Sequence, residues 1–96
     1  MPATTDKITR RGRGFLVNID GQEIYLTPSE FRLLDLLRRE SGRAFTRSEL
    51  VARVMPDSVV LERTIDVHVR SLRRKLGTAA ARIQTVTQVG YKYVPG

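Results

Sequence analysis

The 96-residue sequence contains no cysteine and no tryptophan, and only 6% of its residues are aromatic. Without cysteine, the chain forms no disulfide scaffold and no Cys-bearing zinc site, and it has no thiol for nucleophilic catalysis. Its apolar runs are only a few residues long, far short of the roughly 20 residues that span a bilayer, and residues 1–13 lack the apolar segment of a secretion signal. We therefore expect a cytoplasmic protein that is neither inserted in a membrane nor secreted.

Acidic residues are scarce relative to basic ones. Seventeen Lys and Arg stand against ten Asp and Glu, which gives a formal net charge of +7. A surface with this imbalance attracts polyanions. The length fits one domain, because independently folding units usually have about 50 to 200 residues, and hydrophobic residues make up 41% of the chain, enough for one small core.

The first thirteen residues differ in composition from the rest of the chain. The segment MPATTDKITRRGR carries four basic residues and a single large aliphatic one, Ile8. Such a segment buries too little apolar surface to offset the entropy lost on ordering. We predict a flexible basic arm or interdomain linker over residues 1–13 and a folded domain over residues 14–96.

Two capping boxes mark the starts of two predicted helices. In Thr27-Pro28-Ser29-Glu30, the Thr hydroxyl covers the amide three residues on, the Glu carboxylate reaches back, and proline occupies the first helical position. A helix is predicted from there to Gly42. Residues 46–49, with the sequence TRSE, repeat the capping box and open a shorter helix that ends before Pro56.

Two hairpins and a third helix complete the predicted elements. Alternating apolar residues around the turn dipeptide Asp20-Gly21 predict a hairpin over residues 14–26. Helical periodicity returns from about residue 60 to residue 76. Residues 83–94 are rich in β-branched and aromatic residues around a turn, which predicts a second hairpin containing Tyr93 as a core residue.

The third predicted helix has an apolar face and a basic face. At about 100° per residue, the core face comprises Ile65, Val69, Leu72 and Leu76. The opposite face centres on an apolar residue and carries mostly arginine, with Arg73 on the flank: Val67, Arg63, Arg70, Ser71 and Arg74.

This basic face has few acidic neighbours. Solvated helix faces usually mix charges of both signs, but here only Asp66 lies near the edge, and we expect it to pair with Arg63 or Arg70. The guanidinium group suits phosphate oxygens and the edge of guanine, and the exposed Val67 suits a thymine methyl group. The face therefore fits the major groove of DNA.

The order of elements is that of a winged helix-turn-helix, namely two helices joined by a short turn, the second basic on its outer face, and then a hairpin. The stretches LTPSEFRLLDLL, GRAFTRSELV, ERTIDVHVRSLRRKLG and IQTVTQVGYKYV resemble the C-terminal DNA-binding effector domain of OmpR/PhoB-type two-component response regulators. The resemblance covers residues 14–94. It implies an α+β fold with three helices, an N-terminal β-hairpin or small sheet, and a C-terminal hairpin wing.

The same resemblance implies sequence-specific binding of double-stranded DNA, with the third helix in the major groove. It assigns groove or phosphate contacts to Arg63, Thr64, His68, Arg70 and Arg73, and a thymine contact to Val67. It assigns wing contacts to Thr85 and Tyr91. Ser71 stands where many members carry a base-reading arginine. Thr87 and Gln88 replace the arginine and glycine usual in the wing, which leaves Lys92 to supply charge there.

The resemblance further implies partners beyond DNA. Members of the family carry a receiver domain N-terminal to the effector domain, and its phosphorylation places two effector domains head to tail on direct repeats. A contact with RNA polymerase is implied near Met55, which stands where the loop between the second and third helices often has tryptophan.

Other function classes have less support. Asp66, His68 and Ser71 do not form a catalytic triad, because positions two apart on a helix do not face each other and no oxyanion turn is near. We therefore expect no enzyme activity, no metal site and no cofactor. Proteins that bind single-stranded nucleic acid usually expose more aromatic residues than the 6% found here, so single-strand binding has little support. The alternative that remains is a protein-interaction adaptor that docks its basic helix on an acidic partner.

Overall fold

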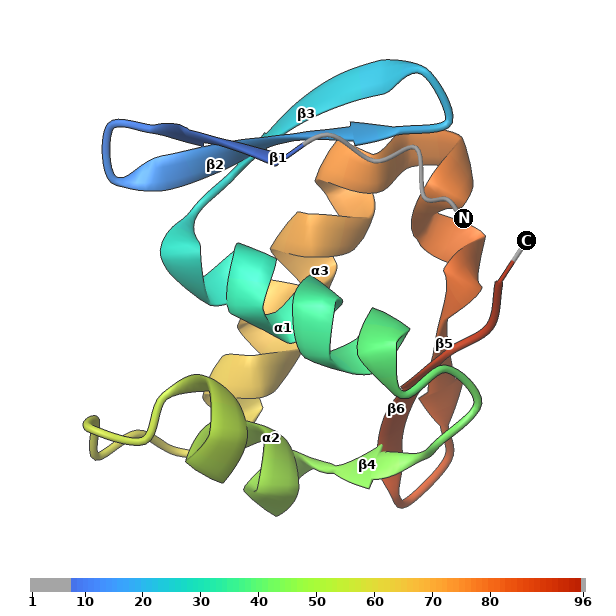
Figure 1. The fold of residues 1–96 in the computed structure, drawn as a ribbon. Helices are drawn as coiled ribbons and strands as arrows, with labels where there is room; N and C mark the ends of the chain where they lie inside the picture. The colour runs from blue at the N-terminus through green and yellow to red at the C-terminus, as the bar shows by residue number, and fades with distance from the viewer. Residues whose placement is uncertain (1–7, 96) are drawn as a thin grey trace.

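The computed structural model describes residues 8–95, which form two small antiparallel sheets around three helices (Figure 1). In chain order, the elements are β1 (Ile8–Arg11), β2 (Gly14–Ile19), β3 (Gln22–Leu26), α1 (Pro28–Arg39), β4 (Phe45–Thr46), α2 (Arg47–Val54), α3 (Arg63–Leu76), the 3₁₀ helix η1 (Gly77–Arg82), β5 (Ile83–Val86) and β6 (Gly90–Tyr93). The predicted α+β winged helix-turn-helix is confirmed.

The N-terminal sheet has the order β1-β2-β3. Ile19 pairs with Gln22, so Asp20 and Gly21 form a two-residue turn in which both have positive φ, 54° and 83°. This left-handed geometry matches the twist of the two strands, which is why Asp-Gly is favoured there. The Asn18 carboxamide oxygen accepts a hydrogen bond from the Gly21 amide at 3.0 Å. The predicted first hairpin is confirmed.

Strand β1 corrects the prediction that residues 1–13 form a flexible arm. Residues 8–11 pair with β2, from Ile8 opposite Val17 to Arg11 opposite Gly14. All four residues of β1 are exposed, so the strand is held by backbone hydrogen bonds and by the Arg10 guanidinium, 5.6 Å from the centre of the Phe15 ring. The prediction rested on the small number of apolar side chains in this segment. It therefore missed a strand that is held mainly by backbone hydrogen bonds. Residues 12 and 13 of the predicted arm form the turn between β1 and β2, and residues 1–7 lie outside the described residues.

Both predicted capping boxes are present. The Thr27 and Thr46 hydroxyls accept hydrogen bonds from the amides of Glu30 and Glu49, and each carboxylate accepts one in return from the threonine amide. Helix α2 ends before Pro56, as predicted.

Helix α3 begins at Arg63, later than the predicted start near residue 60. The preceding apolar residues continue the helical pattern in sequence, but Val59 and Leu61 are exposed in the loop between α2 and α3. No side chain caps the start of α3. The loop is therefore longer than the sequence pattern indicates.

The core lies where the helices meet the two sheets. The predicted apolar face of α3 is buried, and Tyr93 is buried as well, so both predictions are confirmed. The wing strands β5 and β6 join the short strand β4 in the order β4-β6-β5, a pairing that the sequence did not indicate. Gly90 is required at this junction, because a Cβ atom there would overlap the carbonyl oxygen of Phe45. None of the helices within residues 8–95 has the length and apolar character needed to cross a membrane.

We predict that Val69→Ala and Val67→Ala differ in stability although both remove the same atoms from α3. Val69 is buried and Val67 is 63% exposed. Val69→Ala should lower the free energy of unfolding by about 2 kcal/mol, through lost burial and a residual cavity, whereas Val67→Ala should change it by less than about 0.5 kcal/mol. Urea denaturation measures both values. Equal losses would place Val67 in the core.

Candidate nucleic-acid interface

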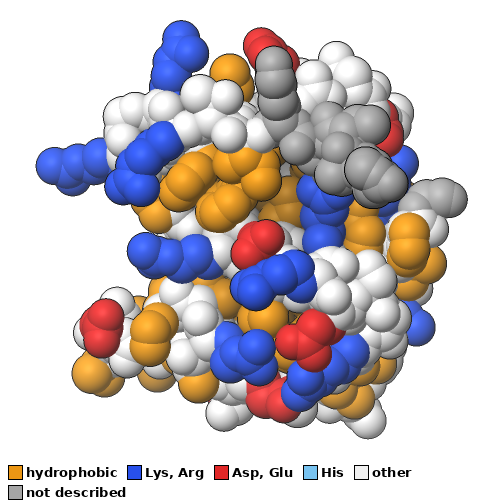
Figure 2. Space-filling model, viewed as in Figure 1, with side chains coloured by type: hydrophobic (Ala, Val, Ile, Leu, Met, Phe, Trp, Pro, Cys, Tyr) orange, Lys and Arg blue, Asp and Glu red, His pale blue; other side chains and the backbone are white. Residues whose placement is uncertain are grey.

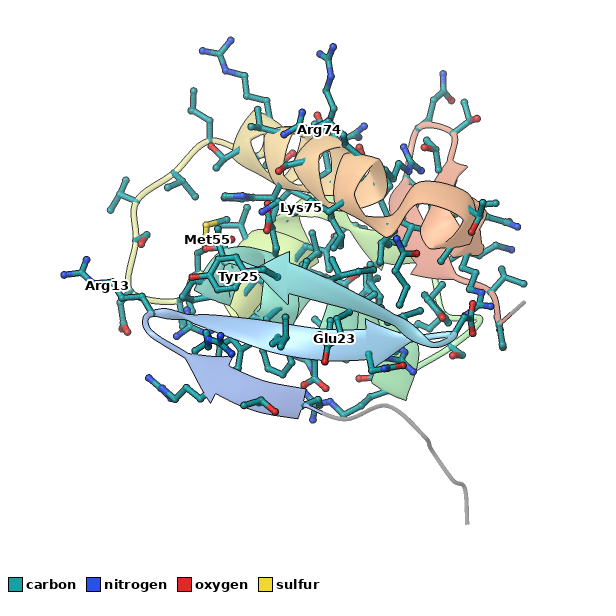
Figure 3. The ribbon with its side chains drawn as sticks, turned by 90° about the horizontal axis from the view of Figure 1, so that it is seen from above. Arg13, Glu23, Tyr25, Met55, Arg74 and Lys75 are labelled. Carbon is teal, nitrogen blue, oxygen red and sulfur yellow. The ribbon has the colours of Figure 1, made fainter. Side chains whose placement is uncertain are left out.

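The outer face of α3 is basic and free of internal partners. Figure 3 shows Arg74 on the outer side of the helix and Lys75 on the side of strand β3. Arg63, Arg70 and Arg74 are exposed around Val67, while Thr64 and His68 are half-buried beside them. Among residues 8–95, no carboxylate forms an ion pair with any of these three guanidinium groups. Their charge is therefore directed outward.

The surface near the end of α1 and the start of α2 contrasts with this face. In Figure 2, which shows the α1 and α2 side of the molecule, basic and acidic side chains lie next to one another. Near the turn that follows α1, the Arg43 guanidinium bonds the carboxylates of Glu40 and Glu49 at 2.6 Å and 3.2 Å. Arg53 bonds Glu40 at 3.4 Å. Charges of opposite sign compensate each other here, as on an ordinary solvated surface.

Asp66 does not pair with Arg63 or Arg70, and that prediction was wrong. Its Oδ1 atom instead accepts hydrogen bonds from Arg47 Nε at 2.7 Å and from the Tyr91 hydroxyl at 2.5 Å. Asp66 lies on the flank of α3 that faces α2 and β6, where these two donors converge. Partial burial acts to raise its pKa, but the bonds from Tyr91 and Arg47 outweigh burial and hold the pKa below its usual value.

Ser71 is not on the outer face either, which corrects a second prediction. Its hydroxyl is half-buried and donates a hydrogen bond to Glu30 Oε2 at 2.6 Å. Lys75, one helical turn further along α3, donates to Glu30 Oε1 at the same distance. A tertiary partner on α1 thus turns both side chains inward, which a helical wheel of α3 alone does not reveal.

Glu30 is the one charged residue among the buried ones of the described chain, with 3% of its surface exposed. Burial by itself raises the pKa of this carboxyl group. The hydrogen bonds from Lys75, Ser71 and the Thr27 amide together have the larger effect and lower the pKa from its ordinary value. The carboxylate is therefore ionised at neutral pH and joins α1 to α3.

Three of the predicted contact residues take part in the link between α3 and the wing. Arg73 donates hydrogen bonds to the Ile83 carbonyl oxygen at 2.8 Å and to Thr85 Oγ1 at 2.9 Å. Tyr91 is buried, with 5% of its surface exposed, and its phenol ring lies 5.5 Å from the Arg73 guanidinium carbon. Tyr91 is buried, Arg73 is half-buried and Thr85 is exposed, and the DNA contacts assigned to all three stay predictions.

The tip of the wing projects on the same side of the molecule as the outer face of α3 (Figure 3). Thr87 and Gln88 are exposed there, and Lys92 is half-buried on β6. Gln88 has a φ of 64°, a left-handed conformation that favours glycine. The tip therefore adopts a conformation that favours glycine with a glutamine in that position, and it carries no positive charge of its own.

Sequence reasoning missed Arg47, which begins α2 and reaches both α3 and the wing. Its Nε donates to Asp66, and its guanidinium carbon lies 5.6 Å from the centre of the Tyr91 ring. The sequence contains no local signal for this role, because the partners lie 19 and 44 residues away. No cluster of His, Asp or Glu suited to a metal ion occurs within residues 8–95.

Three helices with a basic outer helix and a β-hairpin beside it define a winged helix-turn-helix protein. Residues 21–93 match the family described as "Transcriptional regulatory protein, C terminal". The match covers most of the chain, so the chain belongs to this family, and the resemblance to the effector domains of OmpR/PhoB-type response regulators is confirmed.

Individual relatives agree with this assignment. The chain is 41% identical over 95 residues to the transcriptional regulatory protein BaeR of Escherichia coli, covering 95% of this chain and 39% of BaeR. It is 42% identical over 79 residues to the phosphate regulon regulator PhoB of Pseudomonas aeruginosa, covering 80% of this chain and 34% of PhoB. The chain thus spans less than half the length of these curated relatives.

Among solved structures, the chain is similar to the DNA-binding domain of the response regulator AdeR in complex with an intercistronic region. The TM-score is 0.72 at 28% identity, and the similarity covers 97% of each chain.

We predict that Glu30→Gln weakens the domain and flattens its response to acid. Since the folded-state pKa of Glu30 is depressed, its ion pair contributes stability above the ordinary pKa of 4.5 and loses it as the pH falls through the folded value. At pH 7 the substitution should cost about 2 kcal/mol, less than for a fully buried pair because Lys75 remains partly solvated.

The measurement is urea denaturation between pH 3 and pH 7, with Glu23→Gln as the matched control. Glu23 is an exposed glutamate on β3 (Figure 3). The control should follow the wild type throughout. If both variants lose stability with acid as the wild type does, titration of Glu30 contributes nothing and the assignment fails.

Proposed function

We propose that this domain binds double-stranded DNA as the effector domain of a cytoplasmic transcriptional regulator, with α3 in the major groove and the β5–β6 hairpin as its wing. The observation that carries the proposal is the set of three arginines around the exposed Val67 on the outer face of α3, none of which forms an ion pair within residues 8–95. Arginines without internal partners leave a field that an external polyanion neutralises. An α-helix with this face fits the major groove.

Phosphate contacts supply most of the affinity in this proposal. Arg63 and Arg74 lie at the two ends of the exposed face, eleven residues apart, so they extend along the groove rather than converge on one base. Val67 and Arg70 lie between them and are the residues placed to contact base edges. Ser71 is engaged by Glu30 and does not take part.

The wing contributes charge rather than base recognition. Thr87 and Gln88 at its tip have no guanidinium group to enter a narrow minor groove. Lys92 supplies one positive charge, which steadies a phosphate without following groove width. Most sequence discrimination therefore comes from α3.

Further partners follow from the family. Because the chain spans only 39% and 34% of two regulators that it matches, we propose that a receiver domain belongs to the full-length protein and that two effector domains bind head to tail on direct repeats. The loop between α2 and α3 exposes Val59 and Leu61, apolar surface suited to a protein partner, and we assign the contact with RNA polymerase to it.

The test compares Arg63→Ala with Arg39→Ala in duplex binding over a range of salt concentrations. Arg63→Ala should weaken binding to all duplexes similarly and reduce the slope of log affinity against log salt by about one unit, because one phosphate contact is lost. Arg39 pairs with Asp35 on α1, away from the outer face of α3, and its loss should leave the slope unchanged.

Competitors separate DNA binding from the adaptor alternative. Unrelated duplex DNA should displace the bound duplex, and polyglutamate at equal charge should displace it poorly. Equal slopes for wild type and Arg63→Ala would remove Arg63 from the phosphate contacts. Displacement by polyglutamate alone, or no salt-dependent duplex binding by the wild type, would overturn the proposed function in favour of docking on an acidic protein.

A further inference from the structure

Asp66 joins three parts of the proposed DNA-binding surface at one atom. Its Oδ1 accepts hydrogen bonds from Tyr91 on β6 and from Arg47 at the start of α2, at 2.5 Å and 2.7 Å. Helix α2, helix α3 and the wing thus meet at a single carboxylate oxygen. We refer to Asp66, Tyr91 and Arg47, with Arg73 beside them, as the Asp66 latch.

Arg73 reinforces the latch through the other strand of the wing, β5. The guanidinium carbons of Arg47 and Arg73 lie 5.6 Å and 5.5 Å from the centre of the Tyr91 ring, within the range of cation–π attraction. Arg73 also bonds the Ile83 carbonyl oxygen and Thr85 Oγ1, so both wing strands are tied to α3 by side chains.

The backbone provides little attachment for the wing. Strands β5 and β6 have four residues each. Their backbone is attached to the preceding part of the described chain by the two residues of β4 and by a hydrogen bond from the Gly42 amide to the Tyr93 carbonyl oxygen at 2.7 Å. A two-stranded hairpin of this size is marginal by itself. Core packing of Ile83 and Tyr93 and the side-chain bonds to α3 therefore contribute much of what orients the wing.

We propose that Asp66 is a positioning residue that makes the wing and α3 one rigid DNA-binding unit, an inference that rests on the proposed function. An acidic residue on a helix that faces phosphates repels them, so charge alone disfavours aspartate here. The hydrogen bonds from Tyr91 and Arg47 let the Asp66 carboxylate hold the wing against α3, and this contribution to DNA affinity is larger than the loss caused by repulsion. The affinity gained by orienting the wing exceeds the affinity lost to the negative charge.

The first test asks whether Asp66 affects DNA binding by positioning the wing or only through its negative charge. Asp66→Ala and Glu62→Ala each remove one negative charge near the start of α3, and the exposed Glu62 side chain has no hydrogen bond or ion pair within residues 8–95. Charge alone predicts that both variants bind a duplex more tightly than the wild type. The latch predicts that Glu62→Ala does so and that Asp66→Ala binds about 2- to 30-fold more weakly.

The second test removes one hydroxyl group and leaves every charge in place. Tyr91→Phe breaks the bond to Asp66 but keeps the ring beside the two arginines, and Tyr93→Phe, two residues along the same strand, is the matched control. Tyr91→Phe should weaken duplex binding and lower the salt slope by about one unit as wing phosphates are lost. Tyr93→Phe should leave the slope unchanged.

Circular dichroism and thermal melting establish that each variant is folded at the assay temperature. If Asp66→Ala is not folded, the tyrosine pair decides the question. Asp66→Ala binding as tightly as Glu62→Ala, or Tyr91→Phe binding with the slope of Tyr93→Phe, overturns the latch. A wild-type protein without salt-dependent duplex binding would instead overturn the proposed function, so the two failures are distinguishable.

Discussion

The buried carboxylate of Glu30 sets the orientation of α3 on which the exposed basic face depends. A buried charge is tolerated only when it is paired and hydrogen-bonded. Glu30 meets this condition with Ser71 and Lys75, two side chains one turn apart on α3. Because both Ser71 and Lys75 must reach the same carboxylate, their hydrogen bonds fix the rotation of α3 about its axis and its position along α1. The apolar residues of α3 would bury themselves over a wider range of rotations.

This constraint divides the cations of α3 into two groups. Lys75 and Arg73 are bonded within the domain, to Glu30 and to the wing. Arg63, Arg70 and Arg74 are exposed and form no ion pair with the part of the chain that the structure describes. Glu30 and Asp66 thus hold α3 and the wing in place without neutralising the exposed arginines. Some basic residues of α3 therefore stabilise the fold, and others remain available for the proposed binding of DNA.

Sequence reasoning succeeded where the signals are local. The capping boxes at Thr27 and Thr46 and the Asp20-Gly21 turn involve residues at most three apart, and the structure contains all of them. The core face of α3 follows from its helical period. These features predicted most of the fold.

Reasoning from local signals did not predict the partners of α3. Ser71 bonds a residue 41 positions earlier, and Asp66 bonds one 25 positions later, so no local rule identifies either partner. Strand β1 was missed for a different reason, because backbone pairing to β2 requires no apolar side chains. As a result, the exposure of the three arginines was predicted correctly, whereas the internal hydrogen-bond partners of Asp66 and Ser71 were not.

The most direct measurement is nuclear magnetic resonance mapping of the domain with a duplex selected from a random pool. The account predicts that the largest changes in backbone amide shifts lie along the outer face of α3, at Arg63, Val67, Arg70 and Arg74, and in the wing turn over residues 87–89. Helix α1 and the outer side of the β1–β3 sheet should change little. Largest changes on α1 or on that sheet, with α3 unaffected, would contradict the account.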